Sequence, residues 1–282
     1  MKLGCASVLF SSFHHVPDVD MAHGLRLAAD AGFECIEYND QSLPLFFEAS
    51  DAELRDVRMV ADGLGLDFWS VHMPCLNRFA LASSDPAVMR VSRDTFERTV
   101  EVCALMGARQ LVVHLLDTVG EEKASAEDRL RMAKETLAWL RPKAMDAGVT
   151  LALENMGRSQ SCALMVDLCH ELGPDGMGVC LDIGHAHASG ESPADEACVA
   201  GDLLCTLHIH DNNNSGSGRD EHLPPGFGNI DFPALMQALD DVGYDDVFML
   251  EAMRSHPAVK GMSVEEIVRI SAERARDVCT RH

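Results

Sequence analysis

The chain has 282 residues and a net charge of −22, from 45 Asp and Glu residues against 23 Lys and Arg residues. Such an acidic surface repels phosphate backbones and anionic membranes, so nucleic acid is not an expected partner. Apolar residues make up 47 % of the chain. No apolar run approaches the ~18 residues that a membrane span needs, so we expect no membrane association.

The ten cysteines and the first residues bear on the cellular compartment. The cysteines form no CxxC pair and no framework spacing, a pattern typical of buried, reduced thiols. The start, MKLGCASVLFSSF, contains one Lys and no convincing cleavage site, which argues against a signal peptide. We therefore expect a cytoplasmic protein.

Apolar runs of strand length alternate along the chain with amphipathic helical stretches. A glycine precedes five of these runs, where a helix must stop and turn. The predicted strands are Lys2–Val8, Phe33–Tyr38, Asp67–His72, Gln110–His114, Thr150–Glu154, Gly178–Asp182, Leu203–His208 and Val247–Glu251. The five glycines are Gly32, Gly65, Gly107, Gly148 and Gly243.

The helices between these strands have recognisable starts. Ser50 and Ser263 are each followed three residues later by a Glu, Glu53 and Glu266, as in a capping box. Asp85–Pro86 fits an N-cap followed by proline at the first helical position. The buried face of the helix within Val88–Met106 is predicted to contain Val88, Val91, Phe96, Val100, Cys103 and Leu105.

Continuous apolar strands that alternate with such helices indicate a parallel sheet covered by helices. Eight strand–helix units in 282 residues fit a closed (β/α)₈ TIM barrel, an α/β fold. A doubly wound open sheet is the alternative, but no GxGxxG follows the first strand and no P-loop is present. Because no linker or change of composition divides the chain, we expect residues 1–282 to form one domain.

The segment Asp211–Ile230, DNNNSGSGRDEHLPPGFGNI, is too rich in Gly, Pro and Asn for regular structure. Loops of this length are usually functional or disordered. Asp220 and His222 within it favour an active-site loop over a mobile surface loop.

Nine potential metal ligands fall at or just beyond the carboxyl ends of the predicted strands, where barrel enzymes place their sites. Imidazole and carboxylate groups together suit Zn²⁺, Mn²⁺, Fe²⁺, Co²⁺ or Ni²⁺. The absence of a Cys from the set argues against a thiolate structural site. Several carboxylates in one mouth would repel one another without a cation. The nine are His72, His114, Glu154, Asp182, His185, His208, Asp220, His222 and Glu251.

Other roles compete for some of these residues. A His at a strand end is often a hydrogen-bonded capping residue rather than a metal ligand. Asp182 with His185 could likewise cap a helix after the sixth strand. Glu154 follows an apolar run, and an ionised buried Glu needs a partner. His187 and His210 lie two residues from expected ligands and are ranked as supporting or substrate-facing groups. No GxSxG motif or reactive-Cys context indicates nucleophilic catalysis.

At these residues the chain resembles the xylose isomerase-like barrel superfamily, nearly from end to end. The sugar isomerase and epimerase branch implies that one divalent metal is held by four residues, with two of them doubling as the acid/base pair. The ligands implied are Glu154, Asp182, His208 and Glu251. Glu154 and Glu251 are the implied catalytic pair, and His185 looks like the residue that contacts substrate.

The chain also resembles the endonuclease IV branch, whose three-zinc site uses nine ligands. All nine have a matching position here, in SVH, VVH, LEN, DIGH, LHIHD, DEH and the final LEA. The N-terminal segment lacks the HVS-type start and the basic DNA-contacting loops of that branch. A net charge of −22 also disfavours binding to duplex DNA, where affinity comes largely from Lys and Arg contacts to phosphates. A non-catalytic metal-binding barrel is a third alternative.

The resemblance therefore implies a metal-dependent isomerase or epimerase that acts on a sugar or sugar phosphate through an enediolate. The alternative is a trinuclear zinc phosphodiesterase. Arg158 and Arg254 are the basic residues best placed to meet an anionic group, although surface solvation would explain them equally well. Relatives are often dimers or tetramers, so a homo-oligomer is compatible with the resemblance, but no surface pattern fixes it.

Overall fold

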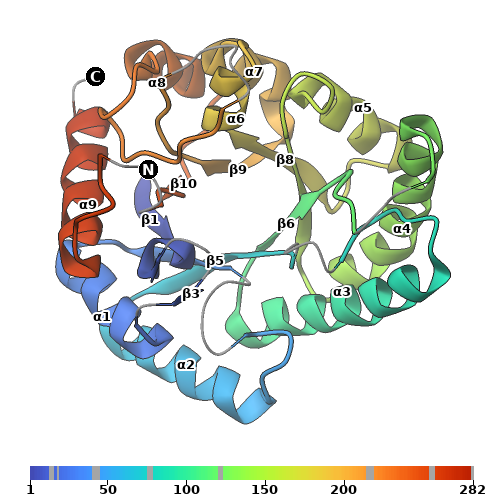
Figure 1. The fold of residues 1–282 in the computed structure, drawn as a ribbon, viewed down its shortest axis with the longest axis horizontal. Helices are drawn as coiled ribbons and strands as arrows, with labels where there is room; N and C mark the ends of the chain where they lie inside the picture. Colours follow the sequence, from blue (N-terminus) through green and yellow to red (C-terminus); the bar gives the residue numbers. More distant parts are fainter. Residues whose placement is uncertain are drawn as a thin grey trace.

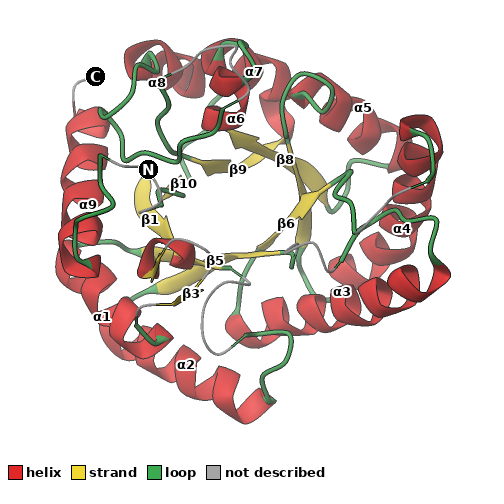
Figure 2. Cartoon of the chain, in the orientation of Figure 1, coloured by secondary structure: helices red, strands yellow, loops and turns green. Residues whose placement is uncertain are grey.

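The structure, a computed structural model, describes residues 1–12, 16–17, 19–39, 45–74, 79–119, 123–213, 219–253 and 258–280. Eight parallel strands form a barrel, and helices surround it (Figures 1 and 2). The barrel strands are β1 (Lys2–Ala6), β4 (Cys35–Tyr38), β5 (Asp67–His72), β6 (Gln110–His114), β7 (Thr150–Glu154), β8 (Met177–Asp182), β9 (Leu204–His208) and β10 (Val247–Leu250). The predicted (β/α)₈ barrel is therefore confirmed.

The sheet closes between β9 and β10. Strand order is β10-β1-β4-β5-β6-β7-β8-β9, and all seven neighbouring pairs are parallel. The N–H of Ile209 donates to the carbonyl of Met249 at 2.8 Å, and the N–H of Glu251 donates to Ile209 at 3.0 Å. These bonds continue the ladder around the barrel and leave the strand ends facing one mouth.

The helices follow the strands in chain order. They are α1 (Met21–Ala31), α2 (Asp51–Leu64), α3 (Pro86–Met106), α4 (Ala126–Asp146), α5 (Cys162–Leu172), α6 (Ile183–Ala188), α7 (Pro193–Ala200), α8 (Phe232–Asp241) and α9 (Val264–Thr280). Short additions are the 3₁₀ turns η1 (Ser7–Phe10) and η2 (Gly201–Leu203) and the antiparallel pair β2 (Ser11–Ser12) and β3 (Val16–Pro17). Within the described ranges, no helix has both the length and the apolar character needed to cross a bilayer.

Most predicted boundaries are confirmed, and the exceptions have local causes. The capping box at Ser50 and the Asp85 cap before Pro86 are both present. The first predicted strand is too long, because the chain turns into η1 after Ala6. The predicted buried face of α3 is wrong at Val91, which is 47 % exposed. Ser92 faces inward instead, where its hydroxyl accepts a bond from a neighbouring backbone N–H.

The barrel interior is filled in layers. Cys35, Trp69, Val247 and Met249 form one apolar cluster, and the Trp69 indole N–H donates to Thr206 Oγ1 at 3.1 Å, linking β5 with β9. A second interior cluster contains Val112, Ala152 and Cys180. Because side chains alternate along a strand, the next inward position on each of these strands lies above these two apolar clusters, toward the carboxyl ends of the strands.

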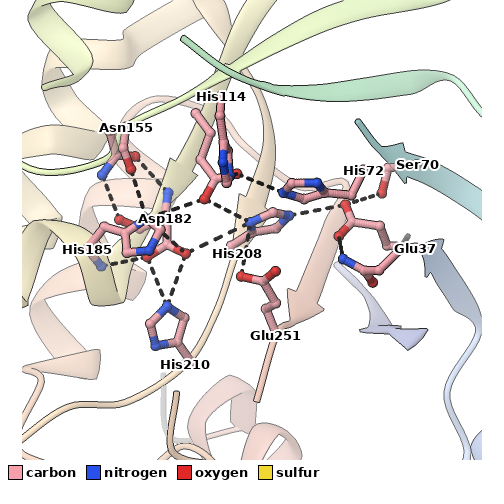
Figure 3. Close-up of polar contacts among 12 residues, drawn as sticks. Glu37, Ser70, His72, His114, Asn155, Asp182, His185, His208, His210 and Glu251 are labelled. Atoms are coloured by element: carbon pink, nitrogen blue, oxygen red, sulfur yellow. Dashed lines mark hydrogen bonds and ion pairs between the residues drawn. The ribbon is translucent and has the colours of Figure 1, made fainter. Parts of the chain in front are cut away.

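Two irregularities change the register of that upper layer. On β5 one extra residue, Trp69, separates the partners of Ile36 and Glu37, so Ser70 lies opposite Glu37. On β9 one extra residue, Cys205, precedes Thr206 in the same way. Bulges of this kind redirect side chains near active sites. Here they bring the polar side chains of Ser70 and His208 into the barrel mouth (Figure 3).

Candidate functional site

The polar layer at the carboxyl ends of the strands contains seven imidazole and carboxylate side chains. Because the strands are parallel, their final inward positions meet at the same mouth (Figure 3). All but His114 are buried, with at most 6 % of the residue exposed. The seven are Glu37 on β4, His72 on β5, His114 on β6, Glu154 on β7, Asp182 on β8, His208 on β9 and Glu251 just after β10.

Four of these residues form the predicted quartet. The candidate ligand atoms of Glu154, Asp182, His208 and Glu251 all lie within 4.8 Å of one another. His208 Nδ1 is 3.4 Å from Glu154 Oε1 and 3.3 Å from Glu251 Oε2. Its other ring nitrogen, Nε2, donates to Glu37 Oε2 at 3.1 Å. This bond leaves the Nδ1 lone pair facing carboxylate oxygens, an arrangement that needs a cation.

His72 and His114 form a second group with Glu154. His72 Nδ1 donates to the carbonyl of Met73 at 2.8 Å, and His114 Nδ1 donates to Asp117 Oδ2 at 2.9 Å. Their Nε2 atoms therefore present lone pairs, at 3.4 Å and 3.2 Å from Glu154 Oε2. Three acceptors again converge on one point.

The third group joins α6 to the long loop. His185 Nδ1 donates to the carbonyl of Asn155 at 3.0 Å, and His222 Nδ1 donates to the carbonyl of Glu251 at 2.9 Å. Their Nε2 atoms lie 3.2 Å and 2.6 Å from Asp220 Oδ2. The structure thus brings all nine predicted residues together, in three adjoining groups rather than one.

His210 completes the third group and was not among the nine. Its Nε2 lies 3.0 Å from both carboxylate oxygens of Asp182, and its ring stacks on His222 with centroids 3.9 Å apart. It lies within 4.8 Å of the other members, His185 included. The predicted supporting role fits its contact with Asp182, which also caps α6 by accepting the His185 N–H at 2.6 Å.

The buried carboxylates of this layer are stabilised by positive charge on the imidazoles beside them. Burial alone would raise the pKa of Glu154, but the imidazoles of His208 and His114 outweigh it and hold that pKa well below its usual range. Burial opposes the charging of His114, yet Glu154 and Asp117 raise its pKa well above normal. Without a metal these imidazoles bind protons, and a divalent ion would displace them.

The residues present fit a divalent metal. Among the described residues, Glu154 Oε2, His208 Nδ1 and His210 Nδ1 are buried polar atoms that make no hydrogen bond. Atoms of this kind are expected where a ligand completes the coordination. Nitrogen and oxygen donors suit the ions expected from the sequence. Cys180 also lies within reach of Glu154 and His208, but burial raises the pKa of its thiol well above normal, which disfavours a thiolate ligand.

The segment after β9 holds Asp220 and His222 in place. The buried carboxylate of Asp211 accepts four backbone N–H bonds, including those of Gly226 and Gly228 at 2.8 Å and 2.9 Å. Asn212 Nδ2 donates to Asp220 Oδ1 at 3.3 Å. His222 itself has a φ of 46°, a left-handed conformation that costs energy outside glycine and that its surroundings must hold.

Sequence reasoning missed several supporting residues. Glu37 is the next-to-last residue of the predicted strand Phe33–Tyr38, and a rule that takes the last inward-facing position of each strand would have found it. Asn155, in LEN, braces β7 against β8 by bonds to the backbone N–H and carbonyl of Asp182 at 2.7 Å and 2.8 Å. Asp117 and Asp211 lie in loops, where no periodicity marks them.

Of the two arginines considered for an anionic group, the structure describes one. Arg158 is exposed, and its guanidinium donates to the carbonyl of Ser189 at 3.1 Å. Arg254 lies outside the described residues. His187, ranked as a supporting residue, bonds to Asn229 Oδ1 at 2.8 Å and so ties α6 to the loop.

Known proteins share this architecture and include both branches considered above. Inosose isomerase from Bacillus licheniformis is 29 % identical over 196 residues, which cover 67 % of this chain and 69 % of that protein. Ketose 3-epimerase from Arthrobacter globiformis is 23 % identical over 271 residues, 93 % and 87 % of the two chains. Probable endonuclease 4 from Mycoplasma pneumoniae is 27 % identical over 216 residues, 70 % and 73 % of the two chains.

A solved structure shows the same fold. The crystal structure of the IOLI protein with a zinc atom bound has a TM-score of 0.79 and 22 % identity, and the match covers 100 % of this chain and 99 % of that one. The sequence profile described as xylose isomerase-like TIM barrel matches residues 25–277. The chain therefore belongs to the xylose isomerase-like TIM barrel family.

Proposed function

We propose that this protein is a divalent-metal-dependent isomerase or epimerase of a sugar or sugar phosphate. The observation that carries the proposal is the buried quartet, in which Glu154 and Glu251 approach His208 Nδ1 at 3.4 Å and 3.3 Å. Two carboxylates, one at the end of β7 and one just after β10, thus flank one candidate metal position. Inosose isomerase and ketose 3-epimerase among the relatives support this class of reaction.

The chemistry required is proton transfer next to a carbonyl group. When bound, the divalent ion would polarise the carbonyl and adjacent hydroxyl of an open-chain sugar and so favour the enediolate. One glutamate would remove the proton, and the other would return one. Return to the opposite face of the same carbon gives an epimer, and return to the neighbouring carbon gives an isomer. His185, partly exposed beside the quartet, would contact the substrate.

A second function, metal-dependent phosphodiester hydrolysis, is favoured by one specific observation. His72 and His114 present Nε2 lone pairs to Glu154, and His185 and His222 present theirs to Asp220. These groups would hold two further ions, as a three-zinc site requires. Probable endonuclease 4 is a relative, but a net charge of −22 opposes binding to a DNA backbone.

Metal content and solvent exchange test the first proposal. The purified protein, loaded in turn with Zn²⁺, Mn²⁺ and Co²⁺, is incubated in D₂O with a panel of ketoses and ketose phosphates, and deuterium uptake is followed by NMR. We expect uptake at the carbon beside the carbonyl, and its loss in Glu251→Gln although the fold survives. General-base catalysis contributes about 10²–10⁴-fold. Substantial activity in a folded, metal-loaded Glu251→Gln protein would remove Glu251 from this role.

The second function has its own assay. Plasmid carrying abasic sites is incubated with the zinc-loaded protein and with Asp220→Asn, whose substitution removes the carboxylate charge from the third group. Nicking that depends on Asp220, together with three zinc ions per chain, would replace the isomerase proposal. One equivalent of metal and no nicking would support it.

A further inference from the structure

We propose that Glu37 is a positioning residue: its carboxylate fixes the ring tautomer of His208 and strengthens His208 Nδ1 as a metal ligand. This inference rests on the metal site of the proposed function, but on neither the substrate nor the reaction. Among the described residues, Glu37 bonds to one member of the quartet, His208, and would act on the metal through that residue (Figure 3).

Glu37 is held by donors from three directions. Its Oε2 accepts the Ser70 hydroxyl at 2.7 Å and His208 Nε2–H at 3.1 Å, and its Oε1 accepts Asn39 Nδ2–H at 3.3 Å. The residue is completely buried. A buried carboxylate is costly unless such donors compensate for lost water. The bulge at Trp69, which places Ser70 opposite Glu37, supplies one of them.

His208 differs from four other candidate imidazole ligands in the ring atom that it presents. So does His210, whose Nε2 faces Asp182 and whose Nδ1 lies 3.5 Å from Asp220 Oδ1. The Nδ1 atoms of those four donate to acceptors, so they offer Nε2. His208 offers Nδ1, because Nε2–H donates to Glu37. An ionised carboxylate accepts and cannot donate, so it enforces this tautomer. A carboxylate behind a histidine also makes the imidazole a stronger donor to a metal.

Packing confines the ring of His208. The residue is completely buried, and its ring stacks on His72 with centroids 5.7 Å apart and planes at 16°. Loss of the Glu37 charge would therefore weaken metal binding by His208 Nδ1 without moving the ring. Substitution of such supporting partners typically costs 10–100-fold in metal affinity.

The test is the zinc affinity of the 282-residue chain, measured by competition with a chromophoric chelator. We expect Glu37→Gln to weaken binding at the tightest site by about 10–100-fold. Ser70→Ala is the matched control, because it removes a bond from the same oxygen and keeps the charge; it should change affinity by less than about 3-fold.

A double variant guards against a simple folding defect. In Glu37→Gln the new carbonyl oxygen would accept from His208 and Ser70, so the new NH₂ group would face the Asn39 Nδ2–H donor. Adding Asn39→Asp restores an acceptor there, keeps the bonds that Asn39 Oδ1 accepts from Val8 N–H and the Ser7 hydroxyl, and conserves net charge. This variant should unfold at the wild-type temperature when metal-free and still bind zinc about 10–100-fold more weakly.

A spectroscopic readout checks the tautomer independently of activity. In the zinc-loaded protein, two-bond ¹H–¹⁵N spectra of the imidazoles should show His208 protonated at Nε2 and bound through Nδ1. Wild-type zinc affinity in the double variant, or a His208 bound through Nε2, overturns the role of Glu37 while leaving the proposed function intact. A wild-type protein that binds no divalent metal overturns both. Weakened zinc binding in a protein that shows no isomerase activity supports Glu37 and rejects only the reaction.

Discussion

Asp211→Ala should release the loop that carries Asp220 and His222. The Asp211 carboxylate is buried, and each of its oxygens accepts two backbone bonds. Oδ1 accepts from Asn212 at 2.9 Å and Ile230 at 3.1 Å, and Oδ2 accepts from Gly226 and Gly228. Alanine leaves these four N–H groups without an acceptor.

The size of the effect follows from those four bonds. A hydrogen bond to a charged group is worth about 1.5–3 kcal/mol, so four of them give an upper bound of roughly 6–12 kcal/mol. The loop lies at the surface and can open to water, which limits the loss to the cost of opening. We expect a loss of about 3–5 kcal/mol, at the severe end for a single substitution. For a chain of this size, that is a fall in Tm of roughly 6–20 °C if the whole protein unfolds cooperatively.

Hydrogen exchange locates the loss and provides the decisive comparison. The amides of Gly226, Gly228 and Ile230 should exchange about 100-fold or more faster in Asp211→Ala, since each 1.4 kcal/mol corresponds to a factor of ten. Asp231→Ala is the control, because Asp231 caps α8 with one bond to Ala234 N–H at 3.0 Å. It should cost about 1 kcal/mol and leave the loop protected. Unchanged protection of the three amides in Asp211→Ala would refute the reasoning.

Three further outcomes are expected. Gly184→Ala places a Cβ against the His210 ring; overpacking should lower stability by about 1–3 kcal/mol despite the better helix propensity of alanine, and an unchanged Tm would contradict the contact. Burial lowers the pKa of His222, but Asp220 outweighs it and raises that pKa from 6.5 to about 9. The metal-free protein should therefore lose up to roughly 3 kcal/mol as pH rises from 6.5 through 9, while the rise in Tm caused by zinc grows; thermal melts across pH that show either trend reversed would contradict this prediction. Glu154→Gln should weaken zinc binding at the quartet, to which Glu154 contributes a carboxylate oxygen, and a zinc titration that gives the wild-type affinity would reject Glu154 as a ligand.

The strand-end rule predicted much of the site because it depends only on topology. Once eight parallel strands are expected, their final inward residues must meet, and His72, Glu154 and His208 follow from position alone. The same rule covers Glu37, which was overlooked because a single Glu in a short apolar run resembles an ordinary strand end. Its importance lies in the bond to His208, and a one-dimensional pattern does not contain that pairing.

Other features depend on register and loop geometry. The bulges at Trp69 and Cys205 shift the pairing by one residue, and neither residue is a usual bulge former such as glycine. The carboxylate of Asp211 reaches residues 15 to 19 positions later in the chain, beyond any local pattern. The exposed Val91 shows a further limit, since small polar residues can occupy an inward helical position when they find a hydrogen-bond partner.

Glu154 links the number of metal ions to the type of reaction. Its Oε1 lies 3.4 Å from His208 Nδ1, and its Oε2 lies 3.2 Å from His114 Nε2. If only the quartet holds an ion, Oε2 keeps a lone pair near two imidazoles and can exchange a proton. If the group of His72 and His114 also holds an ion, both oxygens are coordinated, and Glu154 has no atom left to act as a base. A single tight metal site is therefore a requirement of the two-glutamate proton transfer, and three full sites would exclude it whatever the substrate.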